Sequence, residues 1–200
     1  MRGLLLIDIQ NDFLPGGALA VPRGDEVIAV ANRLAESGDF GAIVATQDLH
    51  PRDHGSFASQ HAGAAPYQHG ELAGLPQTLW PDHCVEGTRG SELAEGLARD
   101  RITAIVPKGT DRTIDSYSGF FDNARRKKTE LQATLQQLGV TELDVVGLAT
   151  DYCVKATVLD ALELGFPVRV HLDGIRAVDL TEGDGARAID AMRTAGAETV

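Results

Sequence analysis

The sequence has no long hydrophobic run and very few cysteines. None of its apolar stretches approaches the ~20 residues that a membrane-spanning helix needs, so we expect no membrane partner. The apolar stretch at the N-terminus meets an acidic residue, Asp8, too early for a secretory leader. Because there are only two cysteines and no such leader, we expect reduced thiols and a cytoplasmic protein.

Positive charge is also in deficit. Lys and Arg together number 18 against 29 Asp and Glu, which gives a formal net charge of −11. One basic cluster stands out at residues 125–128, and we expect it to open the exposed side of a helix. Because an acidic protein repels phosphate backbones, we expect no nucleic-acid partner and favour small molecules instead. The sequence leaves homo-oligomerisation open.

The rest of the composition is that of an ordinary globular protein. Hydrophobic residues make up 43% and charged residues 24% of the 200 positions, with no internal repeat and no low-complexity linker. A chain of this length can bury one sizeable core. We therefore predict a single domain over residues 1–200.

Short apolar runs alternate with helical patterns along the chain. The runs are continuous rather than alternating, which indicates strands that are covered on both faces. Strands interleaved with helices predict a three-layer, doubly wound α/β fold with a mostly parallel sheet and helices on both faces. The expected strands are Leu4–Ile9, Ala42–Thr46, Thr103–Pro107, Leu143–Leu148, Val168–Leu172 and Glu198–Val200, and the expected helices are Asp25–Glu36, Ser91–Ala98, Asn123–Leu138, Tyr152–Leu164 and Thr181–Ala195.

One segment breaks this alternation. Residues 48–90 are rich in Gly, Pro and His and show no regular period. A structureless segment of that length inside a compact domain is usually a functional loop. We predict such a loop here, and expect it to carry a metal-binding region.

Chemically active side chains follow four of the expected strands. Asp8 ends the first strand, and Asp48 with His50 follows the second. Lys108 follows the third strand, and the fourth leads to Cys153. Open parallel sheets bind ligands at the carboxyl ends of their strands. We therefore expect these side chains to share one edge of the sheet.

Cys153 is the candidate nucleophile, because it lies at the first turn of an expected helix. Unsatisfied backbone N–H groups and the helix dipole favour a thiolate there, and the same N–H groups can stabilise an oxyanion. Asp8 can accept the thiol proton, and the Lys108 ammonium can keep that carboxylate ionised and stabilise the thiolate. Each residue alone also has a structural interpretation: a buried hydrophobe for Cys153, a turn cap for Asp8 and a surface side chain for Lys108.

The loop segment holds a candidate metal site. Asp48, His50 and His54 lie close together in the sequence, and His83 follows at a distance. Their oxygen and imidazole groups suit Zn²⁺, Fe²⁺ or Mn²⁺. Three or four protein ligands with open positions would make a catalytic or substrate-orienting site rather than a closed structural one. The alternative is a loop that is merely polar.

Aromatic side chains near these motifs can bind a flat ring. Phe13, Trp80 and Tyr117 can supply the walls of such a pocket. A core role explains any one of them taken alone.

Together these segments resemble the nicotinamidases, also called pyrazinamidases, of the isochorismatase-like cysteine hydrolase superfamily. The resemblance runs from residue 3 to about residue 180, in the expected order. The segment around Cys153 is typical of the whole superfamily, whereas the added metal set points to the nicotinamidase branch. The segments that carry the resemblance are Asp-Ile-Gln-Asn-Asp-Phe from Asp8, Asp48-x-His50 with His54, Trp-Pro-Asp-His-Cys around His83, Lys108-Gly109, Tyr117-Ser118-Gly119-Phe120-Phe121 and Ala149-Thr150-Asp151-Tyr152-Cys153-Val154.

The resemblance implies a metal-dependent cysteine amidohydrolase that converts nicotinamide to nicotinate and ammonia through a thioester, acts on pyrazinamide as well and serves NAD salvage. It implies Asp8, Lys108 and Cys153 as the catalytic triad. It also implies one divalent ion near the pyridine nitrogen, zinc before iron or manganese. The other implied features are the metal ligands Asp48, His50, His54 and His83, the ring-sandwiching residues Phe13, Trp80 and Tyr117, an oxyanion hole from the backbone N–H groups of Ala149 and Cys153, and a cis peptide between Leu148 and Ala149.

Three alternatives stay open at this point. The protein could be another amide hydrolase of the same superfamily, of the carbamoyl-amide type, with a histidine loop that serves structure only. It could be a non-catalytic metabolite-binding domain that retains the fold. A redox-sensing thiol protein would need Cys84 to resolve Cys153, and no sequence feature supports that pairing.

Overall fold

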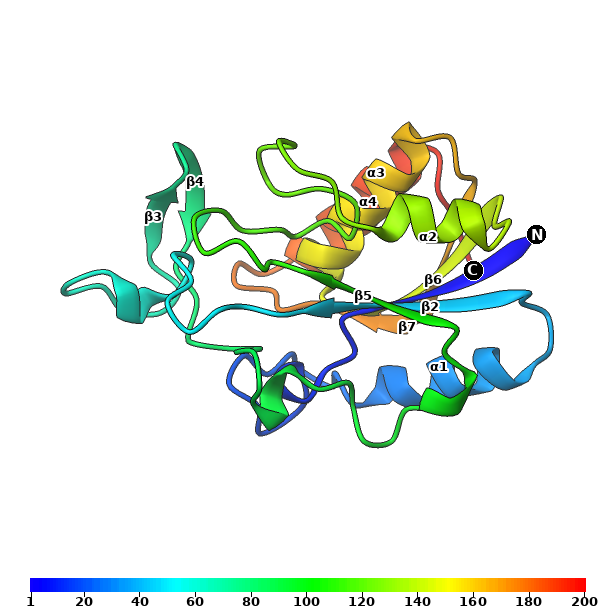
Figure 1. Cartoon of the computed structure of the whole chain (residues 1–200), viewed down its shortest axis with the longest axis horizontal. Helices are drawn as coiled ribbons and strands as arrows, with labels where there is room; N and C mark the ends of the chain where they lie inside the picture. The colour runs from blue at the N-terminus through cyan, green and yellow to red at the C-terminus, as the bar shows by residue number, and fades with distance from the viewer.

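A six-stranded parallel sheet forms the centre of the computed structural model, which describes all residues 1–200 (Figure 1). Its strand order is β5-β2-β1-β6-β7-β8, and every neighbouring pair runs parallel. The doubly wound α/β class expected from the sequence is therefore confirmed. The strands are β1 (Arg2–Ile7), β2 (Ala42–Asp48), β5 (Ala104–Lys108), β6 (Glu142–Leu148), β7 (Val168–Arg176) and β8 (Glu198–Thr199).

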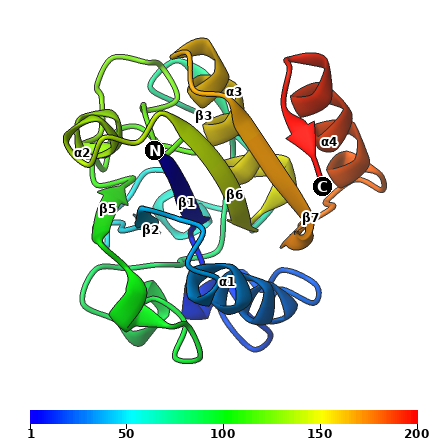
Figure 2. The ribbon, with the colours of Figure 1, turned by 90° about the vertical axis from the view of Figure 1, so that its right-hand side faces the viewer.

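Helices cover both faces of the sheet, as Figure 2 shows in a view along the strands. α1 (Glu26–Glu36) packs on one face, while α2 (Leu131–Gln137), α3 (Lys155–Glu163) and α4 (Asp184–Thr194) pack on the other. No helix is both long enough and apolar enough to cross a membrane.

The first strand shows why these apolar runs are continuous. Leu5 and Ile7 belong to the core beneath α2, α3 and α4, whereas Leu4 and Leu6 belong to the core beside α1. All four are at most 1% exposed. Burial of each such side chain is worth about 1.5–3 kcal/mol. A strand with a core on both sides therefore needs apolar residues at every position.

The predicted helix at Ser91–Ala98 is wrong. The segment consists of short turns around an isolated bridge, because it pairs with the chain that leaves β1: the Asn11 N–H donates to Glu92 O (3.0 Å) and the Ala94 N–H to Ile9 O (2.8 Å). Its buried apolar positions have helical spacing by coincidence.

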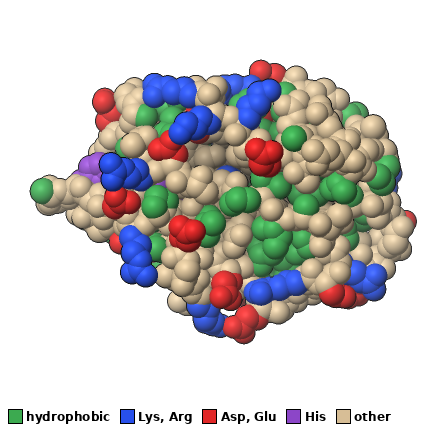
Figure 3. All heavy atoms as spheres, viewed as in Figure 1, with side chains coloured by type: hydrophobic (Ala, Val, Ile, Leu, Met, Phe, Trp, Pro, Cys, Tyr) green, Lys and Arg blue, Asp and Glu red, His purple; other side chains and the backbone are tan.

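The predicted helix at Asn123–Leu138 is mostly wrong, since only its last part forms α2. The Asp122 carboxylate accepts the backbone N–H groups of Ala124, Arg126 and Lys127 and winds the chain into a loop. The basic cluster 125–128 therefore lies in this loop and does not open a helix. Two of its four charges are paired with acids, Arg125 with Asp160 and Lys127 with Asp111. Acidic and basic side chains are interspersed on the face in Figure 3.

Residues 48–90 are less irregular than expected. They contain an antiparallel hairpin of β3 (His69–Leu72) and β4 (Leu75–Thr78), which projects from the body of the molecule in Figure 1. Ala73 and Gly74 form its turn with φ of +56° and +82°. Two successive positive φ angles match the strand twist in a two-residue hairpin. The strands are short and polar, which explains why no period-2 pattern reveals them.

The helix expected at Tyr152–Leu164 begins as a π-helical turn over Thr150–Val154 and continues as α3. The Val154 N–H reaches back to Ala149 O at 3.1 Å, which is the i→i+5 bond of such a turn. Single π turns are frequent at functional sites. The turn is tied to the chain after β7 by the Asp151 carboxylate, which accepts the N–H groups of Val178 (3.0 Å) and Asp179 (2.9 Å).

We predict that Asp151→Ala lowers the free energy of unfolding by about 2 kcal/mol, because it removes two hydrogen bonds from partly buried N–H groups to a charged carboxylate. Urea denaturation measures the change. Asp190→Ala, at an exposed position of α4, is the control and should stay within about 0.5 kcal/mol of the parent. Equal stability of the two variants would contradict this role of Asp151.

Candidate active site

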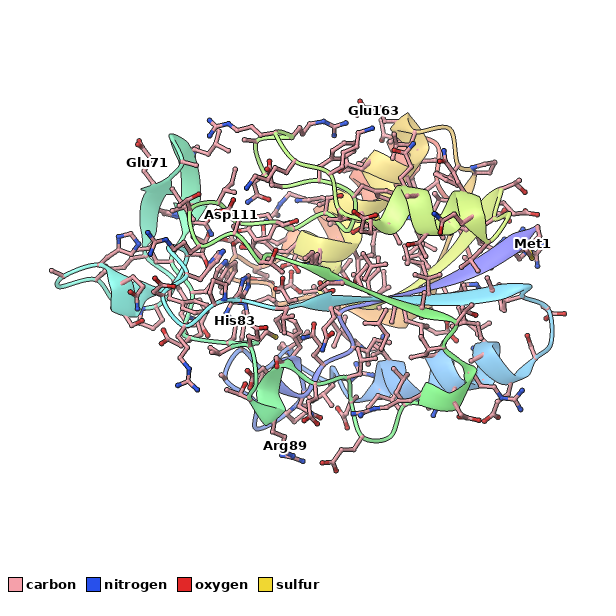
Figure 4. The ribbon with its side chains drawn as sticks, in the orientation of Figure 1. Met1, Glu71, His83, Arg89, Asp111 and Glu163 are labelled. Atoms are coloured by element: carbon pink, nitrogen blue, oxygen red, sulfur yellow. The ribbon has the colours of Figure 1, made fainter.

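The carboxyl ends of four neighbouring strands lie at one edge of the sheet and bring the predicted residues together. Asp8 follows β1, Asp48 ends β2 and Lys108 ends β5. In the β2–β5 pair, Asp48 lies directly opposite Lys108. Cys153 arrives in the turn after β6, the neighbour of β1 on its other side. His83, from the long loop, lies at the same edge in Figure 4.

Lys108 is the centre of this cluster and is 2% exposed. Its Nζ lies 3.0 Å from Asp8 Oδ2 and 2.9 Å from Asp48 Oδ1. It also donates to Ser116 O at 2.8 Å and lies 3.4 Å from Cys153 Sγ. One ammonium thus contacts both carboxylates and the thiol.

The ionisation of this trio follows from its burial. Burial by itself would lower the pKa of Lys108, but attraction to Asp48 and Asp8 outweighs it and raises that pKa well above its ordinary value. Burial raises the pKa of Asp8, and Lys108 offsets only part of this. Burial likewise raises the pKa of the Cys153 thiol well above its ordinary value, against the opposing effect of Lys108. The thiolate expected from the helix start is therefore corrected: the resting thiol keeps its proton beside a carboxylate.

The backbone around Asp8 is unusual. Asp8 has φ +49°, a left-handed conformation that few non-glycine residues adopt. Its N–H donates to Thr46 Oγ1 at 3.2 Å, and the Thr46 hydroxyl donates to Asp8 Oδ1 at 2.6 Å. Both residues are completely buried. Thr46, on β2, therefore holds the carboxylate that faces Lys108.

Cys153 is 6% exposed and lies in the π-helical turn. The N–H groups of Tyr152 and Val154 both donate to Ala149 O at 3.1 Å. The peptide between Leu148 and Ala149 is cis, as the resemblance implies. The backbone N–H groups of Ala149 and Cys153 stay predicted oxyanion donors.

Three of the four predicted metal ligands come together: Asp48, His50 and His83. Their ligand atoms all lie within 4.8 Å of one another, with Asp48 Oδ2 3.2 Å from His50 Nε2 and 3.7 Å from His83 Nε2. His50 Nδ1 bonds Gly109 O and His83 Nδ1 bonds Pro81 O, each at 2.8 Å. A carbonyl on Nδ1 leaves the Nε2 lone pair free for a metal.

This set fits a divalent cation. His50 Nε2 is buried and makes no hydrogen bond of good geometry, although it lies 3.2 Å from Asp48 Oδ2; a buried polar atom without such a bond is unusual. Burial would lower the pKa of His50, but the Asp48 carboxylate outweighs it and raises that pKa to about 9. The site therefore stabilises positive charge at this point, and its mixed oxygen and imidazole donors suit zinc, iron or manganese.

The fourth predicted ligand, His54, lies apart from this set. Its Nδ1 lies 2.7 Å from Ser56 Oγ and its Nε2 lies 3.3 Å from Ile114 O, so both ring nitrogens are engaged. It stacks beside His50 with ring centroids 4.2 Å apart. With His50 and the buried Asp115 it forms a second group of candidate ligands.

The three predicted aromatic residues line one pocket beside Cys153. Tyr152 joins them, with its ring centroid 4.9 Å from Trp80 and 5.4 Å from Tyr117. The Trp80 indole N–H donates to the Tyr117 hydroxyl at 3.2 Å, which fixes the two rings relative to each other. The residues that line the pocket are Phe13, Leu19, Asp48, Trp80, His83, Asp115, Tyr117, Ala149, Tyr152, Cys153 and Val178.

Sequence reasoning missed several of these residues. Tyr152 precedes the nucleophile and Asp115 precedes Tyr117 by two positions, so proximity to a motif was a usable signal for both. Leu19 and Val178 carry no chemical signal, and only the folded chain brings them to the pocket.

Comparison with known proteins shows the family of this chain. The isochorismatase domain model matches residues 2–200. The chain is 54% identical to the nicotinamidase of Escherichia coli over 198 residues, which cover 98% of this chain and 92% of that protein.

Solved structures place the chain in the same family. The yeast nicotinamidase bound to the inhibitor nicotinaldehyde superposes with a TM-score of 0.92 at 33% identity, covering 100% of this chain and 99% of that one. The pyrazinamidase of Pyrococcus horikoshii in complex with zinc gives a TM-score of 0.79 at 36% identity, covering 100% and 98%. The chain therefore belongs to the isochorismatase family, within its nicotinamidase group.

Proposed function

We propose that this protein hydrolyses nicotinamide to nicotinate and ammonia, and pyrazinamide in the same way. The observation that carries the proposal is the convergence of the Cys153 thiol, the Lys108 ammonium and the Asp8 carboxylate beside an aromatic pocket. A flat heteroaromatic amide fits such walls, with its carboxamide at the thiol. In the cell the reaction would supply nicotinate for NAD salvage. Because the nucleophile must stay reduced, we place the reaction in the cytoplasm.

The first chemical step is transfer of the thiol proton. Asp8 takes the proton from Cys153 Sγ, and the sulfur attacks the carboxamide carbon. Lys108, 3.4 Å from Sγ, stabilises the negative charge that forms on the sulfur. The charge then passes to the carbonyl oxygen, for which the backbone N–H groups of Ala149 and Cys153 are the proposed donors.

Asp8 then completes the reaction by returning its proton. Protonated Asp8 donates to the amine as the C–N bond breaks, which releases ammonia and leaves a thioester on Cys153. Asp8 next removes a proton from water, and the resulting hydroxide attacks the thioester to give nicotinate and the free thiol. Each proton that Asp8 accepts is thus returned within one turnover.

Asp48, His50 and His83 are the proposed holders of one divalent ion. When bound, the ion would act as a Lewis acid toward the ring nitrogen and so hold the ring in place. The zinc in the related Pyrococcus horikoshii pyrazinamidase supports zinc as the first choice, and iron and manganese suit the same ligands. A direct bond from His54 stays a prediction, and its engaged ring nitrogens favour a supporting position beside His50.

We expect Cys153→Ala to lower kcat for ammonia release from nicotinamide by at least about 10⁴-fold, because no other group can form the thioester. A coupled ammonia assay measures this, with zinc content checked in parallel. The matched control is Cys84→Ala, which removes the other buried cysteine and should retain activity. A Cys153→Ala enzyme that works at the parental rate would refute the mechanism.

Zinc retention after dialysis distinguishes the residues that bind the metal from the other histidines. We expect His50→Ala to lose zinc on dialysis, and His69→Ala, at an exposed position of the hairpin, to keep it. His54→Ala, which retains the three-residue set, should weaken zinc binding by no more than about 10- to 100-fold. Atomic absorption measures the zinc.

Chelation tests the function against its nearest alternative. We expect the parent enzyme to lose activity with a chelator and to regain it with added zinc. Full activity of the metal-free protein would instead favour the carbamoyl-amide type of hydrolase.

A further inference from the structure

Thr46 is a buried polar residue that the mechanism above does not use. It lies on β2 beside the end of β1, is completely buried, and is absent from the lining of the substrate pocket. Its hydroxyl makes two hydrogen bonds, and both go to Asp8. The Thr46 hydroxyl therefore affects the site through Asp8.

The two bonds set the direction of the hydroxyl proton. The Thr46 oxygen accepts the Asp8 N–H at 3.2 Å, so its single proton is free for Asp8 Oδ1, which it reaches at 2.6 Å. A proton placed on Oδ1 would weaken that oxygen as an acceptor for the Thr46 hydroxyl. Oδ1 is therefore the disfavoured oxygen for protonation.

The other oxygen is free to take a proton. Asp8 Oδ2 is buried and makes no hydrogen bond of good geometry, although it lies 3.0 Å from Lys108 Nζ. Lys108 Nζ in turn lies 3.4 Å from Cys153 Sγ. Oδ2 is thus the carboxylate oxygen on the side of the ammonium and the thiol.

The methyl group of Thr46 holds the hydroxyl in this orientation. It packs so closely on Gly119 that a Cβ at that glycine would lie 2.9 Å from Thr46 Cγ2. A β-branched side chain packed on one side has few alternative rotamers. Methyl and hydroxyl therefore act together, one fixing the rotamer and the other making the bonds.

We propose that Thr46 is a positioning residue, which reserves Asp8 Oδ2 as the oxygen that shuttles the proton between Cys153 and the leaving amine. The proposal rests on the proposed amidase function. In structural terms, the Thr46 hydroxyl occupies Asp8 Oδ1 and holds the left-handed turn of Asp8 in place.

The test compares Thr46→Val, which keeps the shape and removes the hydroxyl, with Thr46→Ser, which keeps the hydroxyl. We expect Thr46→Val to lower kcat about 10- to 100-fold, the equivalent of one hydrogen bond to a charged group, with KM unchanged. Thr46→Ser should recover most of the loss. The matched control is Thr157→Val, since Thr157 is an equally buried threonine whose hydroxyl accepts the Gly119 N–H and does not touch Asp8.

A second readout is the rate at which iodoacetamide alkylates Cys153, followed by mass spectrometry. We expect it to fall in Thr46→Val, to recover in Thr46→Ser and to stay parental in Thr157→Val. This readout does not require amide turnover. If the parent fails to release ammonia but the alkylation rates follow this order, the proposed function fails and the role of Thr46 stands.

Other outcomes overturn the proposal. Parental kcat and alkylation in Thr46→Val would do so, as would an equal loss in Thr157→Val or a Thr46→Ser enzyme as slow as Thr46→Val. If Thr46→Val does not fold, the comparison passes to Thr46→Ala and Thr46→Ser, which both lack the methyl and differ in the hydroxyl. Equal kcat in those two would likewise reject the proposal.

Discussion

The buried ammonium of Lys108 is the interaction on which the rest of the site depends. A lone charge at this depth would be very costly, and here two carboxylates and a carbonyl compensate it. One of these carboxylates belongs to the nucleophile's trio and the other to the metal set. One positive charge against two negative charges leaves the cluster attractive to a further cation. The nucleophile and the metal site are therefore two parts of one electrostatic unit.

The parallel sheet places the residues of this electrostatic unit close together. β5, β2, β1 and β6 are consecutive neighbours, and adjacent strands lie about 4.8 Å apart. Side chains at their carboxyl ends therefore reach one another without long loops. Only the second and third metal residues, His50 and His83, come from the irregular segment between β2 and β5. The fold supplies the positions of Asp8, Asp48 and Lys108, and the loop adds the two imidazoles of the proposed metal set.

The features that could be predicted are those that depend on residues close together in the sequence. The strands, and the acid, lysine and thiol at their ends, follow from apolar runs and the residues after them. The direction of the Cys153 pKa could not be predicted, because it depends on how deeply the thiol is buried. The helix proposed at Ser91–Ala98 failed because long-range bonds to the chain after β1 override its local spacing. His54 stays a predicted ligand, and the contacts of its ring with Ser56 and Ile114 could not be inferred from its spacing in the sequence.

Lys108 lies on β5, one of the two edge strands of the sheet, which pairs with β2 alone. Pro107, just before it, has no N–H to offer another chain, which protects this edge from pairing with other molecules. The same position leaves the strand with support on one side only, and edge elements open at lower free energy than the core. Fraying of β5 would withdraw the ammonium from both carboxylates at once. On heating, loss of catalysis would therefore precede global unfolding, so that an activity half-life reports the opening of one strand rather than the stability of the whole chain.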